Sequence, residues 1–175
     1  MAGIVALLLA GCAAGGFTPR DTVNDPKLSD AEQVVVEADS HIGLAADTIA
    51  ASLGNPTHVS EWGISGCIPP GSYQRRAGRG MTWSDVSADD AKHLIEELET
   101  GWHQPDGLSP GATPVVVDYP DFAISADAVG GNNKVFKISA RFDYETSELS
   151  LVVGTFCEFN EEELSEALLL AGADS

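Results

Sequence analysis

The sequence predicts an α+β fold, with helices packed on one face of an antiparallel β-sheet. Three observations support this prediction. Apolar residues recur at three- and four-residue spacing over 29–53 and again from Ala91 to Trp102, as in amphipathic helices. Apolar and polar residues alternate over 136–142, as in a strand with one wet face. The predicted order is helix, two strands, helix, three or four strands, helix.

Composition and charge limit the classes of protein to which the chain can belong. Its 175 residues are 43% hydrophobic and 21% charged, which is typical of one globular domain. The net charge of −18 repels phosphate backbones, so we expect no nucleic-acid partner. An acidic surface also keeps an exported domain soluble, and this role needs no ligand.

The N-terminus resembles a bacterial lipoprotein signal. An apolar run ends in Leu9-Ala10-Gly11-Cys12, which resembles the lipobox, so we expect residues 1–11 to be a signal peptide and Cys12 to carry the lipid. The usual basic residue before the run is missing, and we expect a start codon further upstream. The alternative is that residues 4–10 are a buried element and Cys12 is a core thiol. Breakers over 12–27 predict a flexible tether, followed by a domain over 28–175.

With Cys12 assigned to lipid, two cysteines remain in a domain that we expect to be exported. Such a pair normally forms a disulfide in an oxidising compartment, so we predict a Cys67–Cys157 bond. The alternative is a reactive thiol, but neither cysteine lies in a CxxC pair or at an obvious helix N-terminus.

Capping residues and breakers give the element boundaries in the first half of the chain. A capping box that begins at Ser29 starts the first helix, and Gly54-Asn55-Pro56 ends it near residue 53. Residues 57–85 read as two irregular strands joined by an exposed turn, with residues 74–80 as a glycine-flanked loop. Ser87 caps the second helix.

Alternation and turn residues organise the second half. We expect strands that begin near 115 and 122, a hairpin turn at 130–133, and a strand at 136–142. A turn over 143–148 leads to the last strand, which ends at Cys157. Asn160 and Glu163 then open a C-terminal helix.

This layout resembles the LppA-like small lipoproteins of mycobacteria and their relatives. The resemblance rests on the lipobox, the long first helix, the capped second helix, the β-meander, and Cys12, Cys67 and Cys157. It implies a cell-envelope lipoprotein of unassigned biochemical activity, held on the outer side of the cell membrane.

Among the residues that could bind a ligand, Arg75, Arg76 and Arg79 form the best candidate patch. Against the acidic background, a cationic loop could dock a carboxylate, a phosphate or an acidic partner through bidentate contacts. The alternative is a solvated loop whose arginines pair with neighbouring acids.

The other candidate sites have structural explanations that we favour. We read the tryptophans as core residues, the histidines as surface residues, the Asp and Asn residues near turns as turn formers, and the G-x-S-x stretch at 63–66 as a glycine-rich strand edge. These residues are Trp62, Trp83, Trp102, His41, His58, His93, His103, Asp118, Asp121, Asp127, Asn132 and Asn133. We expect no catalytic residue, no metal and no cofactor.

We therefore predict a non-enzymatic envelope lipoprotein, anchored to the membrane through Cys12, whose domain binds an envelope protein or a small molecule. A first alternative is a carrier with an apolar pocket for a lipid, which would need a large cavity. A second is a hydrolase, which would need polar residues clustered in a cleft.

Overall fold

The fold is taken from a computed structural model that describes residues 30–67, 74–102, 108–110, 117–119, 123–130 and 136–170. The predicted signal peptide, Cys12, the tether and Ser29 lie outside these residues. The described elements are, in chain order, α1 (Asp30–Leu53), β1 (His58–Val59), β2 (Gly63–Gly66), β3 (Arg75–Trp83), α2 (Ala88–Trp102), β4 (Ser109–Pro110), β5 (Val117–Tyr119), β6 (Ala123–Gly130), β7 (Phe136–Asp143), β8 (Glu148–Thr155) and α3 (Glu161–Leu170).

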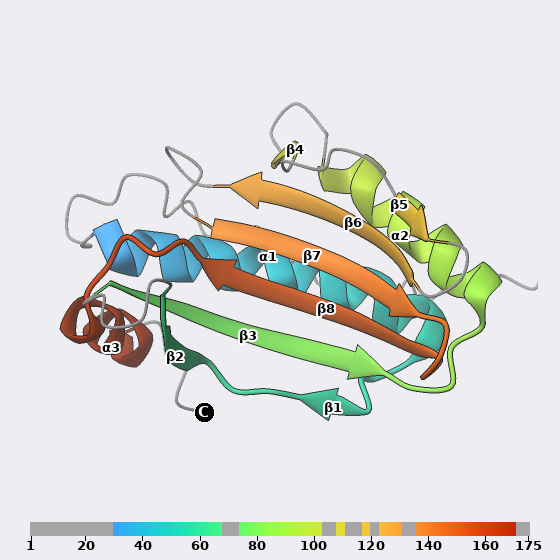
Figure 1. The fold of residues 1–175 in the computed structure, drawn as a ribbon, viewed down its shortest axis with the longest axis horizontal. Coiled ribbons are helices and arrows are strands. Elements are labelled where there is room, and N and C mark those ends of the chain that lie inside the picture. The colour runs from blue at the N-terminus through green and yellow to red at the C-terminus, as the bar shows by residue number, and fades with distance from the viewer. Residues whose placement is uncertain are drawn as a thin grey trace, which may run out of the picture.

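The strands form one antiparallel sheet in the order β1-β3-β8-β7-β6-β4 (Figure 1). The long strands β3, β8, β7 and β6 make its centre. Strand β2 also pairs with β3, and β5 also pairs with β6. Strands β6, β7 and β8 follow one another along the chain as a meander. Strand β3 precedes helix α2 in the chain and pairs with β8, the last strand of the meander.

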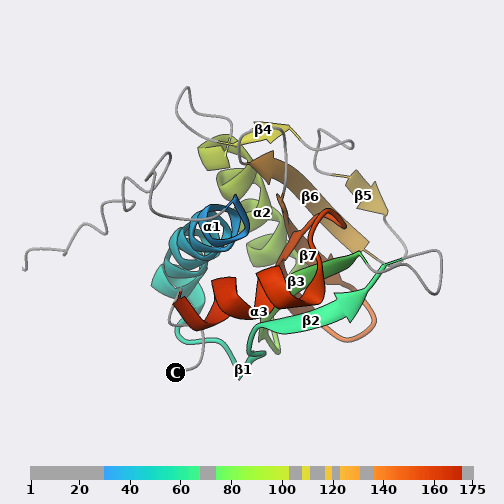
Figure 2. The ribbon, with the colours of Figure 1, turned by 90° about the vertical axis from the view of Figure 1, so that its left-hand side faces the viewer.

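The helices lie on one face of this sheet, and Figure 2 shows them together on one side of the strands. Helix α1 packs against β8, β7 and β3, α2 packs against β6 and β7, and α3 packs against α1 and the start of β3. Val35, Ile42 and Ile49 are fully buried at seven-residue spacing along α1, and they mark its face toward the sheet. The predicted α+β fold is confirmed.

Period-two burial gives each long strand a core face and an open face, as the alternation predicts. In β7 the buried set is Phe136, Ile138, Ala140 and Phe142, and in β8 it is Leu149, Leu151, Val153 and Thr155. The residues between them face away from the helices. The open face of the sheet therefore stays uncovered by any of the described helices (Figure 2).

Two of the predicted helix caps are present. Ser87 Oγ accepts a hydrogen bond from the Asp90 backbone N–H at the start of α2. Asn160 and Glu163 form a reciprocal capping box at the start of α3, because each side chain accepts from the other's backbone N–H at 2.9 Å. The predicted turn after β7 is also confirmed, since residues 144–147 are turn residues.

Gly130 occupies a core position that leaves no room for a side chain. A Cβ atom placed there would lie 2.3 Å from the Phe136 ring and 2.5 Å from a Leu108 methyl group. We expect Gly130→Ala to lower the free energy of unfolding by about 1–3 kcal/mol, because it overpacks the core. Urea denaturation would measure this loss. Gly154→Ala is the matched control, since its nearest neighbour outside the flanking residues lies at an ordinary 3.5 Å, and an equal loss in both variants would contradict the argument.

Candidate functional site

The candidate arginine patch lies on a strand and not on a loop. We predicted a loop at 74–80 from its glycines, but residues from Arg75 onward belong to β3, which pairs with β8 and with β2. A Cβ atom at Gly78 would lie 2.9 Å from the Val153 carbonyl oxygen. The glycine is needed because the backbones of β3 and β8 approach closely there, and this packing overrides the breaker signal.

Strand alternation separates the predicted patch. Arg75 and Arg79 point to the helix side of the sheet, whereas Arg76 points to the open side. Arg75 Nε pairs with Glu161 of α3 at 3.3 Å. Arg79 donates to Asp39 of α1 at 2.6 Å. The predicted three-arginine binding patch is therefore wrong, because adjacent residues of a strand face opposite ways.

Asp39 joins α1 to the edge of the sheet. Its carboxylate also accepts a hydrogen bond from Trp62 Nε1 at 3.1 Å, so one side chain holds both the indole and the Arg79 guanidinium. These two cations on the helix side, Arg75 and Arg79, are thus structural contacts. Of the predicted alternative, the pairing with acids is confirmed for these two arginines, whereas the solvated loop is wrong because both lie in β3.

Arg76 differs from the other two. Its Nε donates to Ser65 Oγ at 3.1 Å on the neighbouring strand β2. Among the described residues, no Asp or Glu carboxylate lies within ion-pair distance of it. Arg76 is the candidate residue that keeps its charge available on the open face.

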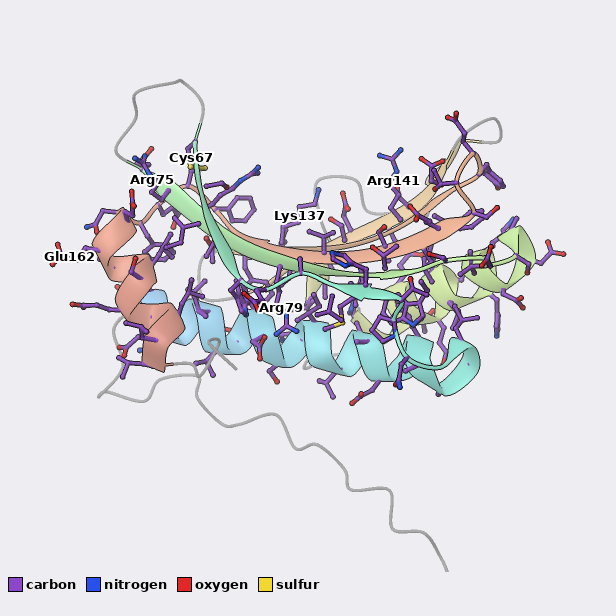
Figure 3. The ribbon with its side chains drawn as sticks, turned by 90° about the horizontal axis from the view of Figure 1, so that it is seen from below. Cys67, Arg75, Arg79, Lys137, Arg141 and Glu162 are labelled. Atoms are coloured by element: carbon purple, nitrogen blue, oxygen red, sulfur yellow. A yellow bond between two sulfur atoms is a disulfide. The ribbon has the colours of Figure 1, made fainter. Side chains whose placement is uncertain are left out.

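The open face is concave, because the strands bend away from α1 towards their ends (Figure 3). Lys137 and Arg141 stand on this face, as the alternation of β7 predicts. Lys137 Nζ pairs with Asp127 at 2.8 Å, and Arg141 lies 3.5 Å from Asp143. Both cations are therefore balanced by acids on the same face.

A trough of about 400 Å³ lies on the open face at the α3 end of the sheet. Its floor is a row of glycines, since the register aligns Gly63 with Gly78 and Gly78 with Gly154 across β2, β3 and β8. Lys137 of β7 is the next residue in the row. With no side chains on three neighbouring strands, the backbone itself is exposed to a ligand.

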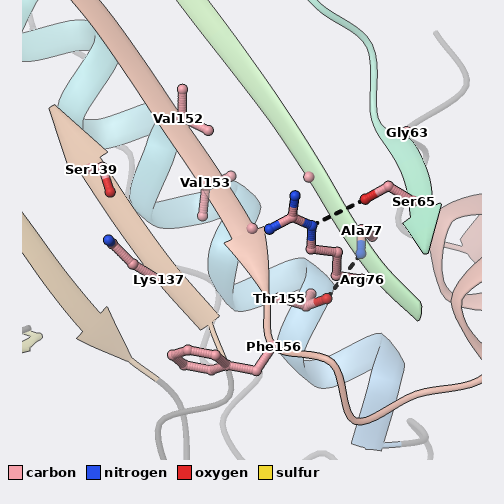
Figure 4. A pocket seen from close by; sticks show the side chains of 12 residues that line it. Gly63, Ser65, Arg76, Ala77, Lys137, Ser139, Val152, Val153, Thr155 and Phe156 are labelled. Atoms are coloured by element: carbon pink, nitrogen blue, oxygen red, sulfur yellow. Dashed lines mark hydrogen bonds between the residues drawn. The ribbon is translucent and has the colours of Figure 1, made fainter. Parts of the chain in front are cut away.

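Side chains form the walls of this trough (Figure 4). Arg76 and Phe156 lie on one side of the glycine row, and Val152 and Ser139 lie on the other. Val152 and Phe156 are exposed apolar residues, with 49% and 37% of their surface accessible. The trough thus combines a cation, hydroxyl groups, apolar walls and a flat floor.

The trough was not predicted as a site. The sequence places Lys137 and Ser139 on the wet face of their strand, but only the register of β2, β3 and β8 aligns the glycines. Each glycine alone reads as a loop or strand-edge signal. Glycines at facing positions of paired strands are the signal that could have revealed the floor of the trough.

The tryptophans are core residues, as expected. Trp83 and Trp102 are buried, and Trp62 packs against the core as a partly buried residue. Gly63–Gly66 forms an edge strand, which confirms that reading of the G-x-S-x stretch. Ser65 in it bonds to Arg76, which cannot serve as the base that a hydrolase nucleophile needs.

Most of the Asp and Asn residues that we read as turn formers lie outside the described residues or make another contact. Asp127 pairs with Lys137. Cys12, His103, Asp121, Asn132 and Asn133 lie outside the described residues, as does the Asp118 side chain. Within the described ranges, no three His, Cys, Asp or Glu side chains are grouped so that they could hold a metal ion.

The histidines are not all surface residues. His58 and His93 are exposed, but His41 of α1 is partly buried against the Phe136 ring, with ring centroids 5.7 Å apart. The surface prediction is therefore wrong for His41. Burial lowers the pKa of His41 below its ordinary value, because desolvation disfavours the charged imidazolium.

This lowered pKa makes stability depend on pH. Below about pH 6.5 the unfolded chain binds a proton at His41, whereas the folded chain keeps the imidazole neutral until the pH reaches its lowered pKa. The free energy of unfolding therefore falls as the pH falls through this range, by at most about 1.4 kcal/mol per pH unit from this group. We expect His41→Gln to lose less stability than the wild type between pH 7.5 and pH 5.5 in urea denaturation. Equal losses in the two proteins would show that His41 does not contribute.

The disulfide predicted from the cysteine count is present. Cys67 follows β2 and Cys157 follows β8, and their sulfur atoms are bonded at 2.07 Å. The bond ties the edge strand β2 to the end of a central strand, beside the trough. It therefore restrains the part of the sheet that carries Ser65 and the start of the glycine floor.

None of the described helices is long and apolar enough to cross a membrane. Compared with known proteins, the chain matches no family model, no curated protein and no solved structure.

Proposed function

We propose that the chain is an exported lipoprotein, anchored to the cell membrane through a lipid on Cys12, whose domain binds a ligand outside the cytoplasm without catalysing a reaction. The observation that carries the binding role is the trough on the open face, with Arg76 unpaired by any described carboxylate. Its volume of about 400 Å³ lies within the range of small-molecule sites.

Two further observations support export and anchoring. The Cys67–Cys157 disulfide is of the kind that persists in oxidising compartments outside the cytoplasm. The lipobox-like Leu9-Ala10-Gly11-Cys12 supplies an acylation site, and two or more acyl chains on it would give stable anchoring. The resemblance to the LppA-like lipoproteins is consistent with the same location.

The open face supports a binding role better than it supports the two alternatives, a lipid carrier and a hydrolase. A lipid carrier needs an apolar cavity that encloses acyl chains, whereas the trough opens to solvent and is lined by the cations Arg76 and Lys137. A hydrolase needs a nucleophile within reach of a base, and Ser65 contacts an arginine instead.

Intact mass spectrometry of the chain from a lipoprotein-processing host tests the proposal. We expect a mass that begins at Cys12 and includes acyl chains, with two thiols that react with alkylating agent only after reduction. The Cys12→Ser variant is the control and should lose the acyl mass but keep the disulfide. An unmodified chain that retains Met1 and has three free thiols would contradict the proposal.

A further inference from the structure

We infer that the trough binds a flat, ring-containing carboxylate, with Arg76 contacting the carboxylate and the ring lying on the glycine floor. This inference deepens the proposed binding role by assigning a class of ligand. It rests on the charge, the shape and the wall chemistry of the trough.

The charge of the Arg76 side chain favours an anionic ligand, with its negative group at Arg76. Asp127 already compensates Lys137 at 2.8 Å, whereas the only hydrogen bond that the Arg76 side chain makes to a described residue is the one from Nε to Ser65 Oγ. That bond orients the guanidinium and leaves its two terminal nitrogens free to donate. A planar fork of donors matches a carboxylate in a bidentate arrangement. Because the whole protein carries −18, an anion must be held by contact and not by long-range attraction.

The shape of the trough floor favours a flat ligand. Gly63, Gly78 and Gly154 align on three neighbouring strands, and none of the three contributes a side chain to the floor. A ring can therefore lie directly on the sheet backbone. The wall residues are Val152 in β8 and Phe156 directly after it, and four residues of extended chain separate Cα atoms by about 13 Å.

The apolar side chains of the trough walls favour a ligand with a ring over a purely polar ligand. Phe156 and Val152 are exposed apolar side chains on opposite sides of the glycine row, and Figure 4 shows both beside the space above it. An aromatic ring next to Phe156 would gain stacking or edge contacts of about 0.5–1.5 kcal/mol, which converts to roughly two- to tenfold in affinity. Ser139 lies on the Val152 side and offers a hydroxyl to polar substituents.

The test uses the full chain with Cys12→Ser, which removes the lipid and leaves the described residues unchanged. The probe is 2-naphthoate, and its neutral analogue 2-naphthamide isolates the contribution of the charge. Isothermal titration calorimetry gives the affinities, and amide chemical shifts locate the site. We expect naphthoate to bind at least tenfold more tightly than naphthamide and to shift the amides of Gly78 and Gly154.

Three variants make the test specific. Arg76→Gln should weaken naphthoate at least tenfold and leave naphthamide unchanged. Gly154→Val should abolish binding of both by filling the floor, and the Cβ atom that it adds would meet the Ala77 carbonyl oxygen at an ordinary 3.5 Å. Arg141→Gln is the matched control, because it removes an exposed cation from the same face outside the trough and should change neither affinity by more than twofold.

Three results would overturn the inference: no binding of naphthoate at millimolar concentration, equal affinity for the acid and the amide, or equal weakening by Arg76→Gln and Arg141→Gln. Each leaves the lipid anchor on Cys12 untouched. Conversely, absence of acylation in the mass measurement would overturn the anchor and leave naphthoate binding as it is, so the two failures are distinguishable.

Discussion

The double variant Cys67→Ser, Cys157→Ser is expected to lose about 4 kcal/mol of its free energy of unfolding. The disulfide joins residues that are 90 positions apart, and in the chain-entropy model a loop of this length strongly restricts the unfolded chain. Because a domain of this size is stable by only about 5–15 kcal/mol, the loss would be a large fraction of the total.

Urea denaturation in a Cys12→Ser background measures this loss without interference from a third thiol. The reduced form of the Cys12→Ser protein is the control, and it should unfold at the same urea concentration as the variant that lacks both cysteines. The bond holds β2 to the end of β8. In the variant that lacks it, we therefore also expect the backbone amides of β2 to exchange with solvent faster than those of β7. An unchanged midpoint after reduction would contradict the prediction.

Trp83→Ala is expected to cost about 3–5 kcal/mol, since it leaves a cavity the size of an indole in the core. Trp83 is only 2% exposed at the end of β3. Its Nε1 also donates to the Gly54 carbonyl at 2.9 Å, where α1 ends. Gly54 has a φ of 80°, the left-handed conformation that glycine adopts readily, so the indole secures the end of the helix.

Two matched variants separate the cavity from the hydrogen bond. Trp83→Phe keeps an aromatic ring and removes the donor, so we expect a smaller loss of about 1–2 kcal/mol. Trp62→Phe removes the indole donor to Asp39 at a partly buried site and should cost less than Trp83→Ala. Thermal and urea denaturation would rank the variants. A Trp83→Ala loss no larger than that of Trp62→Phe would contradict the core role of Trp83.

Much of the fold could be predicted from local patterns, and the reasons are physical. The period of Val35, Ile42 and Ile49 marks the buried face of α1, and the alternation around Ile138 marks both faces of β7. Ser87 and Asn160 mark helix starts because their side chains satisfy backbone N–H groups there.

The candidate site could not be predicted in the same way, because it depends on which strands pair. Arg75, Arg76 and Arg79 look like one patch in the sequence, and pairing of β3 with β2 and β8 sends them to opposite faces. Gly78 read as a loop former because no local pattern reveals that Val153 of another strand lies against it. Register is a long-range property, and the trough exists only through it.

The edges of the sheet carry a consequence for self-association. The outer edge of β3 is shared by β1 and β2, and that of β6 is shared by β4 and β5, so in the described ranges no outer strand exceeds four residues. Pro110 in β4 has no N–H to offer to another chain. Short, interrupted borders of this kind give a second molecule little backbone on which to add a strand. The protein can therefore keep one broad sheet face uncovered without inviting edge-to-edge aggregation.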